Sequence, residues 1–150
     1  MVAIIWKCFI AFISSLGFAW MFNMPNRWLI PSSTGGVVSW VVFLVCQKYL
    51  GPTIFLPCFI ASVCSALYAF GLSRFSKSPF SMYFMIAVVP LIPGSGLYYT
   101  ILNLAQANRY QTLHFARMTS EYALAIAFGV SVVWAGVEIH RRYRSAHKTK

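Results

Sequence analysis

The chain has 150 residues, of which 59% are apolar, 17% are aromatic and only 9% are charged. Soluble domains carry about 25% charged residues, so this composition excludes an ordinary soluble domain and favours a chain embedded mostly in a bilayer. The formal net charge is +10, and the only acidic residues are Glu121 and Glu138.

Charges and helix-breaking residues divide the chain into five apolar segments, each long enough to cross a hydrocarbon core of about 30 Å. The predicted spans cover residues 2–24, 28–47, 51–73, 79–104 and 119–139, and a basic tail covers residues 140–150. A polar loop is expected between the last two spans, over residues 106–117. A secretory signal is the alternative for the first span, but its apolar run exceeds the usual core of about 7–15 residues. We therefore expect one all-α integral membrane domain with about five transmembrane helices.

The fourth span is the most informative part of the chain. Residues 78–108 are uncharged, and Pro90, Pro93, Gly94 and Gly96 lie in the middle of this stretch. Proline removes a backbone donor and clashes with the preceding turn, so a continuous helix is not expected. In a bilayer the freed backbone groups need protein or water as partners, and transporters use such broken helices to build substrate sites. The sequence predicts a span broken at a Pro-x-x-Pro-Gly segment, with a transport site beside it.

The positive-inside rule gives an orientation for the five spans. With the N-terminus outside and the tail in the cytoplasm, eight of the twelve Lys and Arg residues lie on the cytoplasmic side and four lie outside. The reverse orientation inverts that ratio, so the C-terminus is expected to be cytoplasmic. Topology accounts for much of the positive charge, and no nucleic-acid partner is expected. Docking of the tail to anionic membrane lipid or to a partner is the alternative role for it.

The two glutamates have different interpretations. Glu138 precedes Arg141 and Arg142 by three and four residues, the spacing of an ion pair at a helix end. Glu121 follows Arg117 by four residues and lies deeper in its span. Carboxylates inside a membrane are functional candidates by default. Glu121 is therefore either a proton-coupling or substrate-contacting group or simply the partner of Arg117.

Small residues at four-residue spacing predict close packing between helices. They occur on one face of the fifth span at Ala123, Ala127, Ser131 and Ala135, and on one face of the third span at Ala61, Ser65 and Ala69. We expect these faces to be interfaces, some of them with another chain.

Other kinds of site are not indicated. The four cysteines, Cys8, Cys46, Cys58 and Cys64, lack metal-ligand spacing, so no metal or other cofactor is expected. Ser95 lacks the glycine pattern of a nucleophile elbow, no aspartate is present, and no phosphate-binding loop occurs. We therefore expect that the protein is not an enzyme.

Three sequence signatures occur in order along the chain. They are G-F-A-W-M-F-N-M-P at residues 17–25, then Arg74 and Lys77 before Pro79, and then P-L-I-P-G at residues 90–94 followed by Tyr98. Together they resemble the small membrane subunit of the ThrE-type threonine/serine exporter family. The resemblance covers essentially the whole chain, and the third signature is its most specific part.

The resemblance implies export of small amino or carboxylic acids across the bacterial plasma (inner) membrane, driven by an ion gradient. It also implies pairing with a larger multi-span subunit that carries a soluble region. A structural or regulatory membrane subunit without a substrate site of its own is the alternative function.

The predicted substrate site lies where the fourth span restarts. A helix that begins after Gly94 presents unpaired N–H groups and a positive dipole end, which suit a substrate carboxylate. The candidate binding residues are Pro90, Pro93, Gly94, Ser95, Gly96, Tyr98 and Asn23, with the amide of Leu97 as a further donor and Glu121 as the candidate for ion coupling.

Overall fold

The computed structural model describes residues 2–51, 53–76 and 78–146, in which every regular element is a helix. The elements are α1 (Val2–Met21), α2 (Asn26–Leu50), α3 (Phe55–Ser76), α4 (Phe80–Val88), the 3₁₀ helix η1 (Val89–Leu91), α5 (Gly94–Ala105) and α6 (Arg109–Ala146). Four helices, α1, α2, α3 and α6, are long and apolar enough to cross a membrane. A fifth candidate span consists of α4–η1 and α5, which are bent by 59° relative to each other. The predicted all-α class with a broken fourth span is confirmed.

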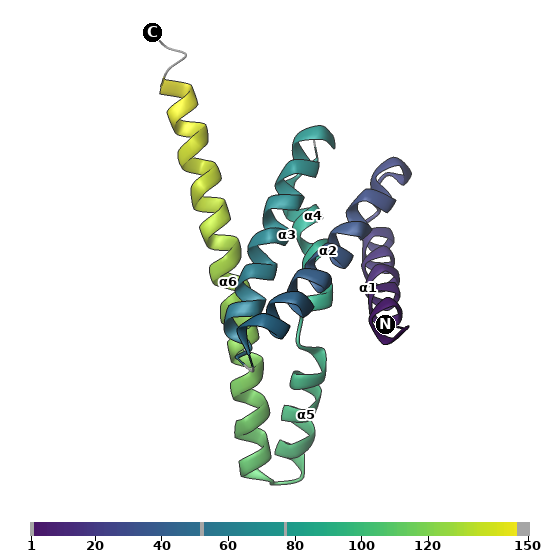
Figure 1. The fold of residues 1–150 in the computed structure, drawn as a ribbon, viewed down its shortest axis with the longest axis vertical. Helices are drawn as coiled ribbons and strands as arrows, with labels where there is room; N and C mark the ends of the chain where they lie inside the picture. Colours follow the sequence, from purple (N-terminus) through teal and green to yellow (C-terminus); the bar gives the residue numbers. More distant parts are fainter. Residues whose placement is uncertain (1, 52, 77, 147–150) are drawn as a thin grey trace.

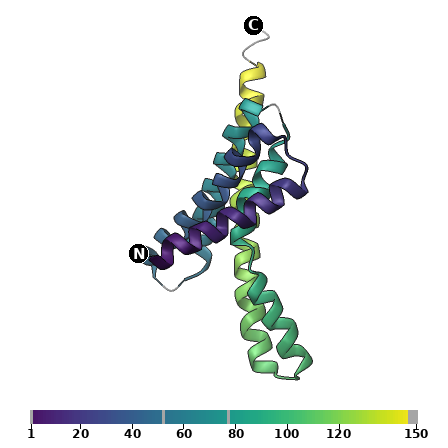
Figure 2. The same ribbon diagram turned by 90° about the vertical axis from the view of Figure 1, so that its right-hand side faces the viewer.

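The helices form two regions (Figures 1 and 2). We call α1–α4, η1 and the C-terminal part of α6 the bundle, and α5 with the N-terminal part of α6 the hairpin, which extends away from the bundle. The α1–α2 and α3–α4 connections lie toward the same end of the molecule as the C-terminus. The α5–α6 turn lies at the opposite end. The break between η1 and α5 is thus the point where the bundle passes into the hairpin.

The bundle is packed through small side chains. Ala61, Ser65 and Ala69 of α3 are fully buried, so the predicted interface on this helix is confirmed. Where α3 crosses α6, a Cβ atom on Gly129 would overlap the Oγ atom of Ser62. Small residues at these positions let the helix backbones approach closely, which is how membrane helices associate.

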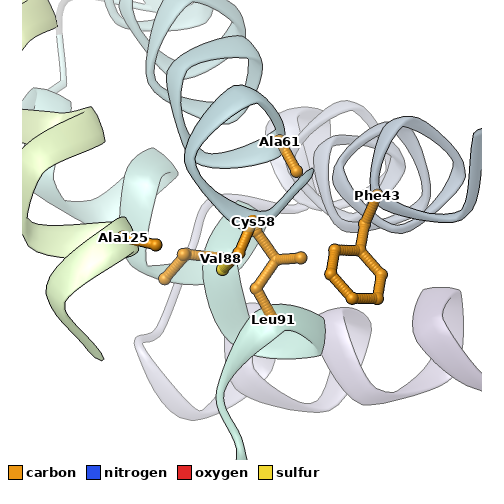
Figure 3. Packing of buried hydrophobic residues seen from close by; sticks show 6 residues of the cluster. All are labelled: Phe43, Cys58, Ala61, Val88, Leu91 and Ala125. Atoms are coloured by element: carbon orange, nitrogen blue, oxygen red, sulfur yellow. The ribbon is translucent and has the colours of Figure 1, made fainter. Parts of the chain in front are cut away.

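Next to this crossing, residues of four helices and η1 meet in one apolar cluster (Figure 3). Its members are Phe43, Cys58, Ala61, Val88, Leu91 and Ala125. Val88 is the last residue of α4 and Leu91 is the last residue of η1. The chain is therefore anchored in the core immediately before the break.

The predicted small-residue face of α6 is not an interface within this chain. Its four members, Ala123, Ala127, Ser131 and Ala135, are exposed. The buried residues of the same helix segment are Ala125, Gly129 and Val133. Within this chain, α3 instead contacts the face of α6 that carries Ala125 and Gly129, so an interface of the predicted face with another chain stays a prediction.

The predicted polar loop over residues 106–117 is wrong. Only Gln106, Ala107 and Asn108 connect α5 to α6, and α6 then runs for 38 residues, about 57 Å at 1.5 Å per residue. No glycine or proline occurs between Gly96 and Gly129, so nothing in this stretch breaks a helix. The carbonyl of Asn108 accepts the N–H of Thr112 at 3.0 Å as the helix begins. Polarity alone predicted a loop, whereas backbone propensity favours a helix.

Some predictions concern parts of the chain that the structure does not describe. Helix α6 includes the first part of the predicted tail, through Ala146, but the side chains of residues 140–146 and all of residues 147–150 lie outside the description. Lys77 and the expected partners of Glu138, Arg141 and Arg142, are among them. The limits of the five spans relative to a bilayer stay predictions.

Candidate functional site

The break in the fourth span is built by its two prolines. Helix α4 tightens into η1, Ile92 is extended with φ −66° and ψ 124°, and α5 begins at Gly94. The N–H of Ile92 donates to the carbonyl of Val89 at 3.2 Å, which closes η1. Pro90 and Pro93 have no N–H to continue an α-helical ladder through this segment. The chain therefore leaves one helix and starts another within three residues.

The first turn of α5 supplies free backbone donors. The N–H groups at the start of a helix have no carbonyl within the helix to pair with. Here the N–H of Gly94 donates to the carbonyl of Ile92 at 2.8 Å, and the N–H of Leu97 donates to the carbonyl of Pro93 at 3.1 Å. The predicted donor at Leu97 is therefore already satisfied, and the amides of Ser95 and Gly96 remain at the positive end of the helix dipole.

A pocket of about 510 Å³ opens at this helix start. Its walls come from α2, the break, α5 and the N-terminal half of α6. The lining residues are Trp40, Pro90, Leu91, Ile92, Pro93, Gly94, Ser95, Gly96, Tyr99, Phe115, Met118, Thr119 and Tyr122. The structure thus brings together five of the seven residues that were predicted to bind substrate. The pocket volume lies within the range of about 300–1,000 Å³ that is typical of small-molecule sites.

The two glycines in the pocket wall have different surroundings. A Cβ atom on Gly96 would lie 2.5 Å from the Oγ1 atom of Thr119, so Gly96 permits close approach of α5 to α6. A Cβ atom on Gly94 would meet no atom within 4 Å. Gly96 therefore has a packing role, whereas Gly94, which also lines the pocket, has open space at the position of a Cβ atom.

An aromatic wall faces the start of α5. The rings of Tyr99 and Phe115 stack with their centroids 5.2 Å apart. On the bundle side, the ring of Phe43 lies between Trp40 and Tyr122, with centroid distances of 5.6 and 6.0 Å. These contacts orient four rings of the pocket wall, which come from α2, α5 and α6.

Trp40 carries an unpaired polar atom into this wall. Its Nε1 atom is buried and has no hydrogen-bond partner among the described residues. A buried donor without an acceptor costs about 1–3 kcal/mol, so such a group in a native structure calls for an explanation. Because the atom is buried, a ligand acceptor in the pocket would reach it only if the indole ring turned.

The structure places the other two predicted binding residues outside the pocket wall. Tyr98 is 61% exposed, and its ring lies edge-on to Tyr99, which lines the pocket in its place. Asn23 forms the turn after α1, where its φ of 52° lies in the left-handed region that Asn tolerates. This turn is at the end of the bundle remote from α5 (Figure 1). Neither residue meets the five that line the pocket.

Glu121 lies on α6 immediately before Tyr122. Its Oε1 atom is 3.1 Å from the Nε atom of Arg117, so the predicted pair at four-residue spacing is confirmed. The side chain of Arg117 is 84% exposed and that of Glu121 is 34% exposed. Glu121 does not line the pocket, although its neighbour does.

Sequence reasoning missed the pocket residues that lie far from the break. Trp40, Thr119 and Tyr122 come from segments 50 residues before it and 25 to 30 residues after it. Tryptophan and tyrosine have polar ends that need hydrogen-bond partners when they are buried in a membrane domain. This need is the one feature of the sequence that could have indicated Trp40 and Tyr122 as site residues. Only the packing of α2 and α6 against the break shows that they share a site.

No group of three or more His, Cys, Asp or Glu residues that could hold a metal ion occurs within residues 2–51, 53–76 and 78–146. The residues that line the pocket supply hydroxyl groups, backbone amides, aromatic rings and aliphatic side chains. Such a set suits an organic anion with hydrogen-bond acceptors.

Taken together, the apolar helices and the pocket at a broken span define a multi-pass membrane protein of the transporter class. The sequence model of the family described as threonine/serine exporter, ThrE, matches residues 7–135. The chain belongs to this family, as its sequence signatures predicted. No curated protein and no solved structure gives a significant match.

Proposed function

We propose that this chain is the small subunit of a secondary exporter of small amino or carboxylic acids, of the threonine/serine type, in a bacterial plasma membrane. The pocket at the break is its substrate site, and an ion gradient drives export. The observation that carries the proposal is the start of α5, where the amides of Ser95 and Gly96 border a pocket of about 510 Å³.

The chemistry of this pocket suits a carboxylate. Helix N-termini bind anions because their free N–H groups and the helix dipole both favour negative charge. These interactions are stronger where water is scarce, as in the interior of a membrane domain. The hydroxyl groups of Ser95, Thr119 and Tyr122 provide further hydrogen bonds for the polar groups of an amino acid.

Two exposed surfaces support a partner subunit. The small-residue face of α6, at Ala123, Ala127, Ser131 and Ala135, is exposed. Helix α5 packs on α6 and has no buried residue. Small residues at this spacing favour close helix contacts, so both surfaces suit a larger multi-span subunit that completes the pocket.

The arrangement of the basic residues supports the proposed orientation. Arg27 at the start of α2 and Arg74 near the end of α3 lie toward the same end of the bundle as the C-terminus (Figure 1). With this end in the cytoplasm, the chain obeys the positive-inside rule. Reporter fusions after Ser76 and after Lys150 should therefore both report a cytoplasmic location; opposite locations would contradict the five-span arrangement.

Co-expression tests the proposed function. We expect no efflux of L-threonine or L-serine from cells that express this chain alone, and clear efflux when the larger subunit is present. Robust transport by the purified single chain in liposomes would contradict the need for a partner. A structural or regulatory subunit is distinguished by Ser95→Ala, which would then leave transport in the assembled complex unchanged.

Glu121 is the proposed coupling residue of this exporter. It is one of only two carboxylates in the chain, and it adjoins Tyr122 in the pocket wall. A change in its protonation would alter the pair with Arg117 and so act on the segment of α6 that borders the pocket.

A further inference from the structure

A second cavity adjoins the pocket at two residues of the pocket wall. Its volume is about 170 Å³, and it is lined by Lys7, Ile10, Ala11, Ser14, Trp40 and Pro90. Trp40 and Pro90 also line the larger pocket. These two residues are therefore common to a cavity on α1 and to the pocket at the start of α5.

The partition between the cavities is made of side chains rather than paired backbone. Pro90 has no N–H, and it approaches α2 at Gly36, where an added Cβ atom would lie 3.2 Å from the Cγ atom of Pro90. The indole ring of Trp40 is held by stacking on Phe43. A change in the rotamer of Trp40 would thus connect the two cavities without breaking a helix.

The shared wall and the smaller cavity each hold a donor that lacks an acceptor among the described residues. The Nε1 atom of Trp40, in the partition itself, is buried and unpaired among the described residues. Lys7 adds a positive charge to the smaller cavity. The only two carboxylates of the chain are both on α6, and Glu121 is paired with Arg117 at 3.1 Å. Lys7 therefore forms no ion pair within the described part of the chain.

We infer that the smaller cavity is a second anion-binding station on the path of the substrate, which passes between Trp40 and Pro90. The inference rests on the proposed function and extends it. The substrate carboxylate moves from the amides of α5 to the indole N–H of Trp40, which becomes accessible when the ring turns, and then to the ammonium group of Lys7. Each step exchanges one donor for another, so the carboxylate is never left without a partner in a region of low dielectric constant.

The test uses the complex of this chain with its larger subunit, reconstituted in vesicles, with radiolabelled L-threonine as the probe. Trp40→Phe keeps an aromatic ring at the partition but removes the N–H, and Lys7→Gln removes the charge. A hydrogen bond to a charged group contributes about 1.5–3 kcal/mol, so each variant should raise the half-saturating concentration of L-threonine by about tenfold or more. We also expect 1-aminopropan-2-ol, which lacks the carboxylate of threonine, not to compete.

Matched controls are available on the same helices. Trp6→Phe changes an exposed tryptophan beside Lys7, and Lys48→Gln removes a charge from the last turn of α2. Neither residue lines either cavity. Both controls should transport L-threonine as the unchanged complex does.

Labelling of Ser14→Cys gives a second measurement that does not depend on transport rate. Ser14 lines the smaller cavity, so L-threonine should slow the modification of this cysteine by a water-soluble thiol reagent, measured on the peptide that contains residue 14. An unchanged labelling rate, together with normal transport by Trp40→Phe and Lys7→Gln, would overturn the second station. An absence of L-threonine transport by the unchanged complex would instead overturn the proposed function.

Discussion

In the bundle, α3 buries Ala61, Ser65 and Ala69 completely, whereas α5 in the hairpin buries no residue at all. The bundle is held by close contacts between small residues of several helices. The hairpin has one internal support, the N-terminal half of α6. The pocket lies at the junction, with one wall on the fixed bundle and one on the less supported hairpin. The difference shows that the two walls of the pocket have unequal support within the described part of the chain.

The strongest test of the bundle is Gly129→Leu. A Cβ atom at this position would overlap Ser62 Oγ and lie 3.2 Å from the backbone carbonyl of Phe59, so α3 and α6 would have to separate. Overpacking costs about 1–3 kcal/mol even where side chains can move, and here part of the obstacle is backbone. We expect little folded protein, measured as the yield of monodisperse protein in detergent.

Gly136→Leu is the matched control on the same helix. A Cβ atom on Gly136 would meet no atom within 4 Å, so this variant should fold normally. Equal yields of the two variants would contradict the view that the α3–α6 crossing holds the bundle together.

The second prediction concerns the junction. Gly94→Leu places bulk in open space beside the free amides of α5, because no atom lies within 4 Å of the new Cβ atom. We expect export of L-threonine to be abolished while the complex still inserts and assembles. Counterflow in vesicles and pull-down of the larger subunit give the two readouts. Export at the unchanged rate by a well-assembled variant would remove the substrate site from this segment.

The third prediction tests how much Pro93 alone contributes to the break in the fourth span. Pro93→Ala restores a backbone N–H to the break, but Pro90 and Gly94 still disfavour a continuous helix. We expect the fold to be retained and substrate to bind more weakly, by about three- to tenfold, which corresponds to roughly 0.7–1.4 kcal/mol. The half-saturating concentration in counterflow measures this effect, and a complete loss of export would show that Pro93 alone maintains the break.

The spans and the break could be predicted from the sequence, whereas the residues that the bundle and α6 contribute to the pocket could not. The spans and the break follow from local signals, because charges, prolines and glycines act where they occur. Gly94, Ser95 and Gly96 could be placed in the site for the same reason. Trp40 and Thr119 could not, since their membership depends on how α2 and α6 cross the break.

One wrong prediction, and one that stays a prediction, have physical reasons as well. Arg109 and Gln111 are polar, but they are compatible with a helix, and α6 therefore extends far beyond the expected span. The spacing of Ala123 and Ala127 is correct for close packing, but it does not say whether the contact is with α3 or with another chain. In this chain Ala125 and Gly129 of α6 are buried.

The last prediction has the smallest expected effect on folding, on assembly and on L-threonine counterflow. Glu121→Gln breaks a largely exposed pair with Arg117, and such pairs contribute about 0.2–1 kcal/mol. Folding, assembly and L-threonine counterflow should therefore be nearly unchanged, because the residue does not line the pocket. Only the dependence of net export on the ion gradient should be lost, since the substituted amide cannot exchange a proton. Parallel measurements of counterflow and of gradient-driven efflux distinguish the roles, and retained gradient dependence would leave Glu121 as no more than the partner of Arg117.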